Sequence, residues 1–338
     1  MLSKTLSIGI GLILATTGCA LSSTTSDPVK TLVVATHGSW AMDKAVIKEF
    51  EKANGVTVKV RPQGDAGELT NKLILTKAAP IADVVYGIDN TFASRAIQQK
   101  VLANFSPQGA QGVLSGQLTP IDFGDVCVNI DDTWFAKNKI APPKGLGDLT
   151  KKRYRNLLVT PGATTSSTGL AFLLATIAKY GDSWPSYWKK LVANGVKVDA
   201  GWEDAYTVDF TAGGGNGDRP IVVSYASSPP FTIPEGGDRP TTSALLGTCF
   251  RQVEYAGVLA GAKNPDAAEA FVEFMIAKRF QEALPDNMYV FPVNPDAALP
   301  EVWARWAKLP KAPLSMPADQ IAAEREKWLA QWRDIVTS

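Results

Sequence analysis

Histidine and cysteine are scarce in this sequence: His37 is the only histidine, and the three cysteines stand at positions 19, 127 and 249. So few thiol and imidazole groups argue against a structural zinc site, which uses four of them. A surplus of charge is also lacking, since 34 basic and 33 acidic side chains leave a net charge of +1. No overall field therefore attracts nucleic acid or an anionic membrane, and partners have to be recognised at local sites.

Catalytic motifs are also sparse. A nucleophilic triad that uses histidine would have to use His37, and no G-x-S-x-G elbow is present. The tract GGGNGD lacks the lysine of a phosphate-binding loop, so we interpret it as a surface turn. We predict no enzyme and no cofactor, with a secreted hydrolase built on His37 and Ser39 as the remote alternative.

The N-terminus differs in kind from the rest of the chain. A lysine precedes LSIGIGLILA (6–15), a run that is too short for a permanent membrane helix and typical of a secretory signal peptide. The Gly-Cys pair that follows resembles the lipobox of bacterial lipoproteins, in which the cysteine is acylated. We predict a signal peptide over 1–18 and a polar, lipid-anchored tether over 19–30 beginning at Cys19; a plain signal peptide is the alternative.

Export to an oxidising compartment makes the other two cysteines informative. Cys127 and Cys249 lie in the strand-like runs DVCVNI and GTCFRQVEYAGVL. We predict a disulfide between them, and two buried, inert thiols are the alternative. Such a bond would stabilise mainly by restricting the unfolded chain, by about 4 kcal/mol in the chain-entropy model.

Strands and helices alternate from residue 31 to about residue 99. TLVVAT, VTVKV and ADVVYGI are strand-like, and the helices between and after them are predicted to begin at caps on Ser39 and Asn90 and after Asp65. This order requires a parallel sheet with right-handed crossovers. Ligands of such sheets bind beyond the carboxyl ends of the strands, where His37, Ser39, Asp65, Asp89 and Asn90 stand.

A long extended segment, PIDFGDVCVNIDDTWF, interrupts this alternation and marks a crossing into a second lobe. GTCFRQVEYAGVL brings the chain back. We predict a two-lobed α/β protein in which each lobe is a mainly parallel sheet flanked by helices. Lobe 1 comprises 31–121 and 248–338, with the C-terminal helix free to pack across both lobes, and lobe 2 comprises 122–247. The crossing strands near 122–128 and 247–253 would form the hinge.

Serine and threonine follow the predicted strands of the second lobe. A strand over 157–160 enters the loop GATTSSTG and then an apolar helix that begins near Thr168. Free N–H groups and hydroxyls at a helix start suit an anion, whereas the alternative is that Ser167 or Thr168 only caps the helix. The strand in RPIVVSYASSPPF ends close to Tyr225 and Ser227.

The stretch GWEDAYTVDF places Trp202 and Tyr206 four residues apart, on one face of a helical turn. An isolated pair of this kind is typical of an amphipathic helix packed on a core. Further along, NPDAAEAFVEFMIAKRFQEAL is predicted as one helix that begins at Pro265, and the next loop displays Met288 and Tyr289.

The order and spacing of six motifs, spread over nearly all of residues 31–336, resemble the thiamine-binding branch of ABC-transporter substrate-binding lipoproteins. The motifs are ADVVYGIDN, TSSTGLAF, GWEDAY, VVSYASSP, MYVFPVN and AAEREKWLAQWRDIV. The resemblance implies a type II periplasmic-binding-protein fold. It also implies an exported monomer, held at the outer face of the cytoplasmic membrane or in the periplasm, that delivers thiamine or a thiamine phosphate to ABC permease subunits.

Residue by residue, the resemblance implies that Trp202 and Tyr225 hold the rings of the vitamin, Asp65 faces it and Ser166 meets its phosphate end. Tyr206 either supports Trp202 from behind or contacts the ligand. The sequence departs from the family at His37, Phe231 and Tyr289, where relatives have Tyr, Tyr and Trp. The complete predicted set is Trp202, Tyr225, Tyr289, Asp65, Ser166, His37, Ser39, Asp89, Asn90, Ser167, Thr168, Tyr206 and Ser227.

The chemistry of thiamine agrees with this set, because a flat pyrimidine joined to a cationic thiazolium needs aromatic faces and carboxylates. Each cation–π contact contributes about 0.5 to 2 kcal/mol. Two other ligands fit less closely. A polyamine would also use aromatics and carboxylates, whereas ferric iron is commonly bound by paired tyrosines and VSYASS contains only Tyr225.

Overall fold

The computed structural model describes residues 30–338 of the chain. The predicted signal peptide, the tether and Cys19 lie outside these residues. Within the described part of the chain, no helix has both the length and the apolar character needed to cross a membrane.

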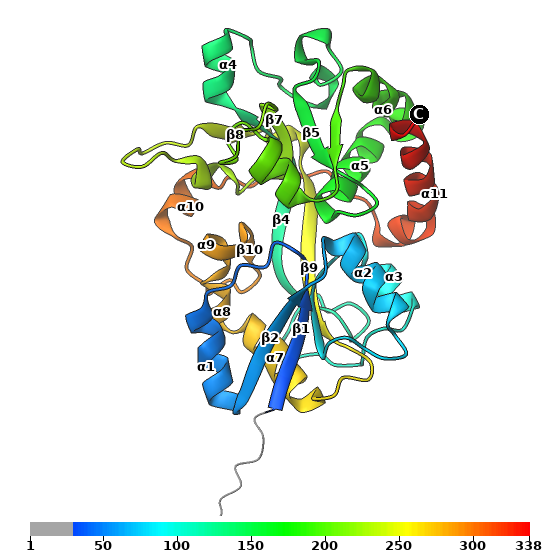
Figure 1. Ribbon diagram of the computed structural model, residues 1–338, viewed down its shortest axis with the longest axis vertical. Coiled ribbons are helices and arrows are strands. Elements are labelled where there is room, and N and C mark those ends of the chain that lie inside the picture. The colour runs from blue at the N-terminus through cyan, green and yellow to red at the C-terminus, as the bar shows by residue number, and fades with distance from the viewer. Residues whose placement is uncertain (1–29) are drawn as a thin grey trace, which may run out of the picture.

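Lobe 1, in the lower half of Figure 1, is built on three parallel strands with β1 between the other two. The strands are β1 (Lys30–Thr36), β2 (Val56–Pro62) and β3 (Val84–Asp89). The helices that follow them are α1 (Lys44–Asn54), α2 (Ala66–Leu75) and α3 (Ala93–Gln98). The alternating strands and helices predicted from the apolar runs are therefore confirmed.

Lobe 2, in the upper half, contains a second parallel set in which β5 lies between the other two strands. The strands of this lobe are β5 (Leu158–Pro161), β6 (Lys197–Asp199), β7 (Ile221–Tyr225) and the short β8 (Thr242–Ala244). Its helices are α4 (Asp132–Asn138), α5 (Ser167–Tyr180) and α6 (Trp184–Ala193).

Two long strands join the lobes and run side by side through the middle of the molecule (Figure 1). They are β4 (Thr119–Asp131) and β9 (Phe250–Val258), and they pair in antiparallel fashion. Because β9 also pairs with β3 and β4 with β7, both parallel sets belong to one mixed sheet in the order β2-β1-β3-β9-β4-β7-β5-β6. The two crossing strands of the prediction are thus the centre of a continuous sheet.

The C-terminal part of the chain, from residue 265 onward, packs on lobe 1 first and then returns to lobe 2. Its elements are α7 (Pro265–Ile276), α8 (Lys278–Gln281), α9 (Leu284–Met288), β10 (Phe291–Pro292), α10 (Glu301–Trp306) and α11 (Ala318–Val336). Helix α11 packs mainly on α6 and also contacts α3. On α11, Trp332 meets Trp188 edge to face, with ring centroids 5.5 Å apart, and Arg325 donates to the Thr91 carbonyl of lobe 1.

Short turns complete the secondary structure. The 3₁₀ turns are Leu146–Asp148, Lys152–Tyr154, Gly181–Ser183, Pro229–Thr232 and Leu246–Thr248, and Asp204–Asp209 is a π-helical turn.

Two predicted helix caps in lobe 1 are wrong. Helix α1 begins after Asp43, whose carboxylate accepts the N–H two residues further on, whereas the Ser39 N–H donates to His37 Nδ1. Residues 37–42 precede the helix because they run over the carboxyl edge of the sheet. Asn90 does not cap α3 either, since its side chain pairs with the backbone of β9, accepting from the Val253 N–H at 3.0 Å.

Two further helix predictions need correction. Ser166 caps α5, and Ser167 and Thr168 lie inside its first turn. The helix that begins at Pro265 is interrupted at Ala277, whose ψ of 147° is extended, so α7 and α8 are separate.

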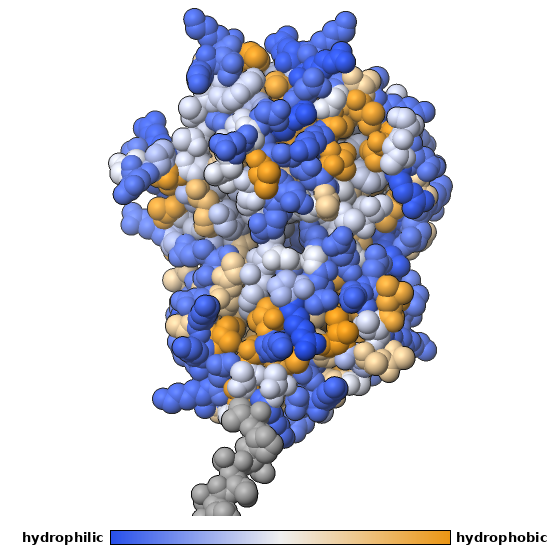
Figure 2. Space-filling view, in the orientation of Figure 1, coloured by the Kyte–Doolittle hydropathy of each residue, from blue (hydrophilic) through white to orange (hydrophobic). Residues whose placement is uncertain are grey.

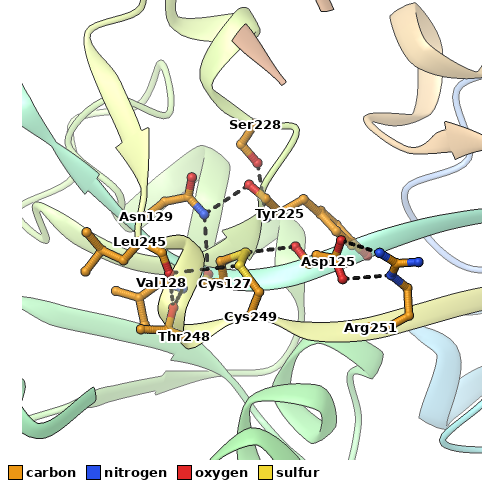
Figure 3. Close-up of a disulfide and its surroundings, with 10 residues drawn as sticks. All are labelled: Asp125, Cys127, Val128, Asn129, Tyr225, Ser228, Leu245, Thr248, Cys249 and Arg251. Carbon is orange, nitrogen blue, oxygen red and sulfur yellow. Dashed lines mark hydrogen bonds and ion pairs between the residues drawn. A yellow bond between two sulfur atoms is a disulfide. The ribbon is translucent and has the colours of Figure 1, made fainter. Parts of the chain in front are cut away.

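The predicted disulfide is present in the strands that join the lobes (Figure 3). Cys127 lies on β4 and bonds to Cys249, which lies one residue before β9 and 122 positions further along the sequence. Beside it, Arg251 forms a two-pronged ion pair with the buried Asp125, at 2.8 and 3.0 Å. This crosslink and ion pair tie β4 to β9 where the chain passes between lobes.

Candidate ligand-binding cleft

Two adjoining cavities lie between the lobes at the carboxyl ends of β1, β2 and β3. The inner chamber encloses about 30 Å³ and is lined by His37, Ser39, Asp65, Ser167, Thr168, Trp202, Tyr225, Glu254, Met288 and Val290. The outer chamber encloses about 170 Å³ and is lined by Gly38, Ser39, Gly64, Asp65, Glu68, Ala200, Gly201, Trp202, Glu203 and Asp204. In Figure 2 hydrophilic residues dominate both lobes, and paler, weakly polar residues gather at the waist between them.

The structure brings seven of the predicted site residues to these chambers. They are His37, Ser39, Asp65, Ser167, Thr168, Trp202 and Tyr225. The other six lie behind the walls: Ser166, Asp89, Asn90, Tyr206, Ser227 and Tyr289.

Trp202 forms the aromatic wall of lobe 2 and borders both chambers. Its ring stacks on Tyr206, with centroids 4.9 Å apart and planes 12° apart, and its Nε1–H donates to Ser224 Oγ at 2.9 Å. Tyr206 is buried and supports Trp202 from behind. Tyr225 lies 6.3 Å from Trp202, so the two rings face one another obliquely across the inner chamber.

Trp202 lies two residues before a π-helical turn, Asp204–Asp209, which is a rare form that is frequent at functional sites. The glycine-rich loop after it packs directly on the turn. A Cβ on Gly213 would lie 1.6 Å from the Tyr206 carbonyl oxygen, and one on Gly217 would lie 2.1 Å from that of Asp209. Larger residues cannot occupy these two positions, so the tract predicted as a surface turn braces the aromatic wall.

Tyr289 lines neither chamber and packs against the back of the same wall. Its ring stacks on Phe231 with planes 17° apart and meets Trp202 edge to face at 5.7 Å. Its backbone lies in the left-handed region, with φ at 62°, and its carbonyl accepts from the Ser227 hydroxyl. Met288, the residue before it, reaches the inner chamber instead.

Asp65 connects the two lobes. Its Oδ1 caps α2 by accepting the Ala66 N–H at 2.8 Å, and its Oδ2 accepts the backbone N–H of Trp202 at 3.2 Å. Two residues further on, the Gly67 N–H donates to the Thr165 carbonyl at 3.0 Å, again from lobe 1 to lobe 2. Both oxygens of Asp65 are therefore used in contacts with backbone groups.

The serine loop at the start of α5 forms part of the inner chamber. Ser166 accepts the Gly169 N–H, and its hydroxyl lies 2.9 Å from that of Thr168. Ser167 is 3% exposed, and its hydroxyl has no hydrogen-bond partner although it borders the chamber. A buried hydroxyl of this kind is available to a ligand.

Three buried carboxylates lie at the floor of the cleft. Glu254 borders the inner chamber, where its Oε1 lies 3.8 Å from His37 Nε2 and its Oε2 accepts from the Tyr86 hydroxyl at 3.3 Å. Behind it, Asp122 accepts from the same hydroxyl at 2.6 Å. Burial, reinforced by the charge of Glu254, raises the pKa of Asp122 well above its usual range.

Asp89, the third carboxylate, lies below the serine loop and has no solvent exposure. Its Oδ1 accepts from the Thr91 N–H, the Thr91 hydroxyl and the Phe92 N–H, whereas its Oδ2 has no partner. Burial raises the pKa of Asp89 to about 6, and the hydrogen bond from the Thr91 hydroxyl opposes that rise.

Comparison with known proteins assigns the chain. Residues 45–311 match the family of bacterial extracellular solute-binding proteins. The chain belongs to that family. Its relatives include the thiamine-binding periplasmic proteins of Salmonella typhimurium, 32% identical over 90% of this chain and 93% of the relative, and of Escherichia coli, 30% identical over the same shares.

Solved structures agree with the assignment. A periplasmic thiamin binding protein matches with a TM-score of 0.80 and 28% identity, over 91% of this chain and 96% of the other. A ferric binding protein from Campylobacter jejuni matches with a TM-score of 0.70 over 90% and 99% of the two chains, but at 19% identity it shows the fold alone. The predicted two-lobed solute-binding fold is confirmed, and this family of binding proteins is not enzymatic.

In this solute-binding protein, two carboxylates that the sequence interpretation did not name are Glu254, which borders the inner chamber, and Asp122 behind it. Each lies in a strand that is mostly buried, in QVEYAGV and in PIDFGDV. An acidic residue inside a buried strand is costly unless it is paired or functional, so this signal was present in the sequence. Within residues 30–338 no cluster of three or more His, Cys, Asp and Glu is arranged to hold a metal ion.

Proposed function

We propose that this protein is the extracytoplasmic solute-binding component of an ABC importer, and that it captures thiamine or a thiamine phosphate between its lobes. One observation supports the proposal most strongly. The inner chamber joins aromatic faces, from Trp202 and Tyr225, to a buried carboxylate, Glu254. The most similar relatives described above carry thiamine-binding names, which agrees with that combination.

The chemistry of the chamber suits a flat cation. Thiazolium has no N–H group to donate, so ring stacking and an opposite charge are the favourable contacts open to it. The indole of Trp202 is held by Tyr206 and Ser224, and a rigid ring loses little freedom when it stacks on a ligand. Ser167, with its unpartnered hydroxyl at the start of α5, would meet the hydroxyl or phosphate end.

Capture requires the lobes to move. Ligand pockets usually measure roughly 300–1,000 Å³, whereas the inner chamber encloses about 30 Å³. We infer that the lobes move as two bodies, lobe 1 being 31–121 with 248–338 and lobe 2 being 122–247. They separate by rotation about β4 and β9, and they close again on the ligand. Helix α11 contacts both lobes, so its contact with α3 would change during this motion.

The site of action follows from the predicted export signal. Residues 1–18 would direct export, and a lipid on Cys19 with the tether over 19–30 would hold the monomer at the outer face of the cytoplasmic membrane. The relatives are named as periplasmic proteins, which agrees with export. The closed form would then deliver its ligand to the permease subunits.

Two other ligands are candidates for the same site. A polyamine would also fit aromatic faces and carboxylates, and ferric iron is bound by the Campylobacter jejuni protein, whose likeness extends to the fold alone. Neither is supported by a relative as similar as the thiamine-binding ones.

Titration calorimetry with thiamine, thiamine monophosphate, thiamine diphosphate, spermidine and ferric citrate tests the proposal. We expect one site per chain with micromolar or tighter affinity for thiamine or one of its phosphates, and at least about a hundredfold weaker binding of spermidine. Binding of spermidine or iron without binding of any thiamine compound would refute it.

A further inference from the structure

Glu254 is a buried carboxylate that borders the inner chamber and has no permanent cation beside it. It is 5% exposed, and its one ion-pair partner among residues 30–338 is His37. Asp125, on the neighbouring strand, shows the contrast, since Arg251 pairs with both of its oxygens. A buried carboxylate normally has such a partner.

The groups that surround Glu254 add negative or neutral character. Asp122 and Tyr86 lie beneath it, and Tyr225 lies beside it on the chamber wall. Burial, and then the charges of Asp122 and Glu254, raise the pKa of Tyr86 well above its usual range. The field at the chamber floor therefore favours a cation in the chamber.

Unpartnered polar groups open into the same space. His37 Nε2 and Ser167 Oγ are both buried, border the inner chamber and have no hydrogen-bond partner within residues 30–338. They border the chamber together with Glu254, whose oxygens accept only long hydrogen bonds, of 3.3 Å, from Gln252 and Tyr86. Two unpartnered polar groups beside such a carboxylate indicate a ligand.

We propose that Glu254 supplies the counter-charge for the cationic ring of the ligand, and that Tyr86 and Asp122 hold its carboxylate in position. Asp65 has a different role, because its oxygens accept the backbone N–H groups of Ala66 and Trp202, so that it caps α2 and joins the lobes. The oxygens of Glu254 accept instead from two neutral side chains, Gln252 and Tyr86, each at 3.3 Å. This inference rests on the proposed function, because it names which carboxylate recognises the thiazolium.

The test compares thiamine with 3-deazathiamine, a neutral isostere in which a thiophene replaces the thiazolium. The wild-type protein should bind thiamine at least about tenfold more tightly, as expected for one close, partly buried charge contact. Glu254→Gln should lose that preference, through weaker binding of thiamine and little change for the isostere. Asp65→Asn should weaken both compounds alike, and Glu273→Gln, at an exposed carboxylate of α7 that lines neither chamber, should change neither.

The outcomes separate the two proposals. Equal affinity of the wild-type protein for both compounds overturns the role of Glu254, whether or not the variant folds. Unchanged thiamine affinity in Glu254→Gln, or an equal loss for both compounds, overturns it as well. Binding of neither compound by the wild-type protein overturns the proposed function itself.

Discussion

Gly67 lies in the first turn of α2 and closes against the serine loop of the other lobe. Its N–H donates to the Thr165 carbonyl, and a Cβ at this position would lie 2.8 Å from the carbonyl oxygens of Thr164 and Thr165. These backbone oxygens cannot move away by a change of rotamer, as the end of a side chain can. Gly67→Ala should therefore force the lobes apart by several tenths of an ångström.

The expected cost is that of an overpacked contact, about 1–3 kcal/mol, and it falls on the closed form. Closure is needed for tight binding, so thiamine affinity should drop by about 5- to 150-fold. The open form escapes the clash with lobe 2, and alanine favours its helix by up to about 1 kcal/mol. The Phe92 ring edge, 3.0 Å from the added atom, belongs to lobe 1 and has to shift slightly in both forms.

Titration calorimetry measures the loss of affinity, and small-angle scattering with and without thiamine measures closure. Gly147→Ala is the matched control, because its Cβ would meet nothing nearer than the Tyr180 hydroxyl at 3.8 Å. We expect the control to bind and close like the wild-type protein. Tight binding by Gly67→Ala would refute the closure contact, and so would an equal loss in the control.

Three further predictions concern the wall, the crosslink and a buried carboxylate. Trp202→Ala should lower thiamine affinity more than Asp65→Asn, because stacking contributes directly whereas asparagine retains an acceptor for the α2 cap; the reverse order in calorimetry would contradict the stacking model. The double variant Cys127→Ala/Cys249→Ala should lower the free energy of unfolding by about 4 kcal/mol while changing thiamine affinity less than about threefold, and a denaturant titration as stable as wild type would contradict this. The pKa of Asp89 is raised by burial to about 6, so the folded state binds more protons than the unfolded state between about pH 4 and 6. This contribution to stability, about 3 kcal/mol, is present below pH 4 and is lost as the pH rises through 6. The free energy of unfolding of Asp89→Asn should therefore depend less on pH between 4 and 6 than that of the wild-type protein. Identical pH dependence in the two proteins would contradict the assignment.

Much of the fold could be predicted from the apolar runs, because strands such as TLVVAT and ADVVYGI are buried on both faces and leave little ambiguity. The order of those strands, together with the return segment GTCFRQVEYAGVL, then predicted that the chain crosses between the lobes twice. Helix starts were less predictable. Ser39, Asp43 and Asn90 are all competent caps, and only the path of the chain over the sheet edge decides which of them is used.

The sequence predicted which types of residue form the site better than it predicted the role of each residue. Aromatic and serine positions at strand ends led to Trp202, Tyr225 and Ser167, which border the chamber. The distance between Asp65 and Trp202, 137 residues apart in sequence, depends on how the lobes meet and has no local signal. For the same reason the sequence shows Glu254 only as one polar residue in a strand. Its position among other buried polar groups becomes visible once β3, β4 and β9 are known to be neighbours in the sheet.

Native mass spectrometry of freshly purified protein tests the central claim most directly. The ligand would be identified by its mass and by its loss on unfolding. The proposed function predicts one thiamine or thiamine phosphate per chain, or stoichiometric uptake when thiamine is added to protein that was unfolded, dialysed and refolded. A refolded chain that takes up none of thiamine, its monophosphate or its diphosphate would contradict it.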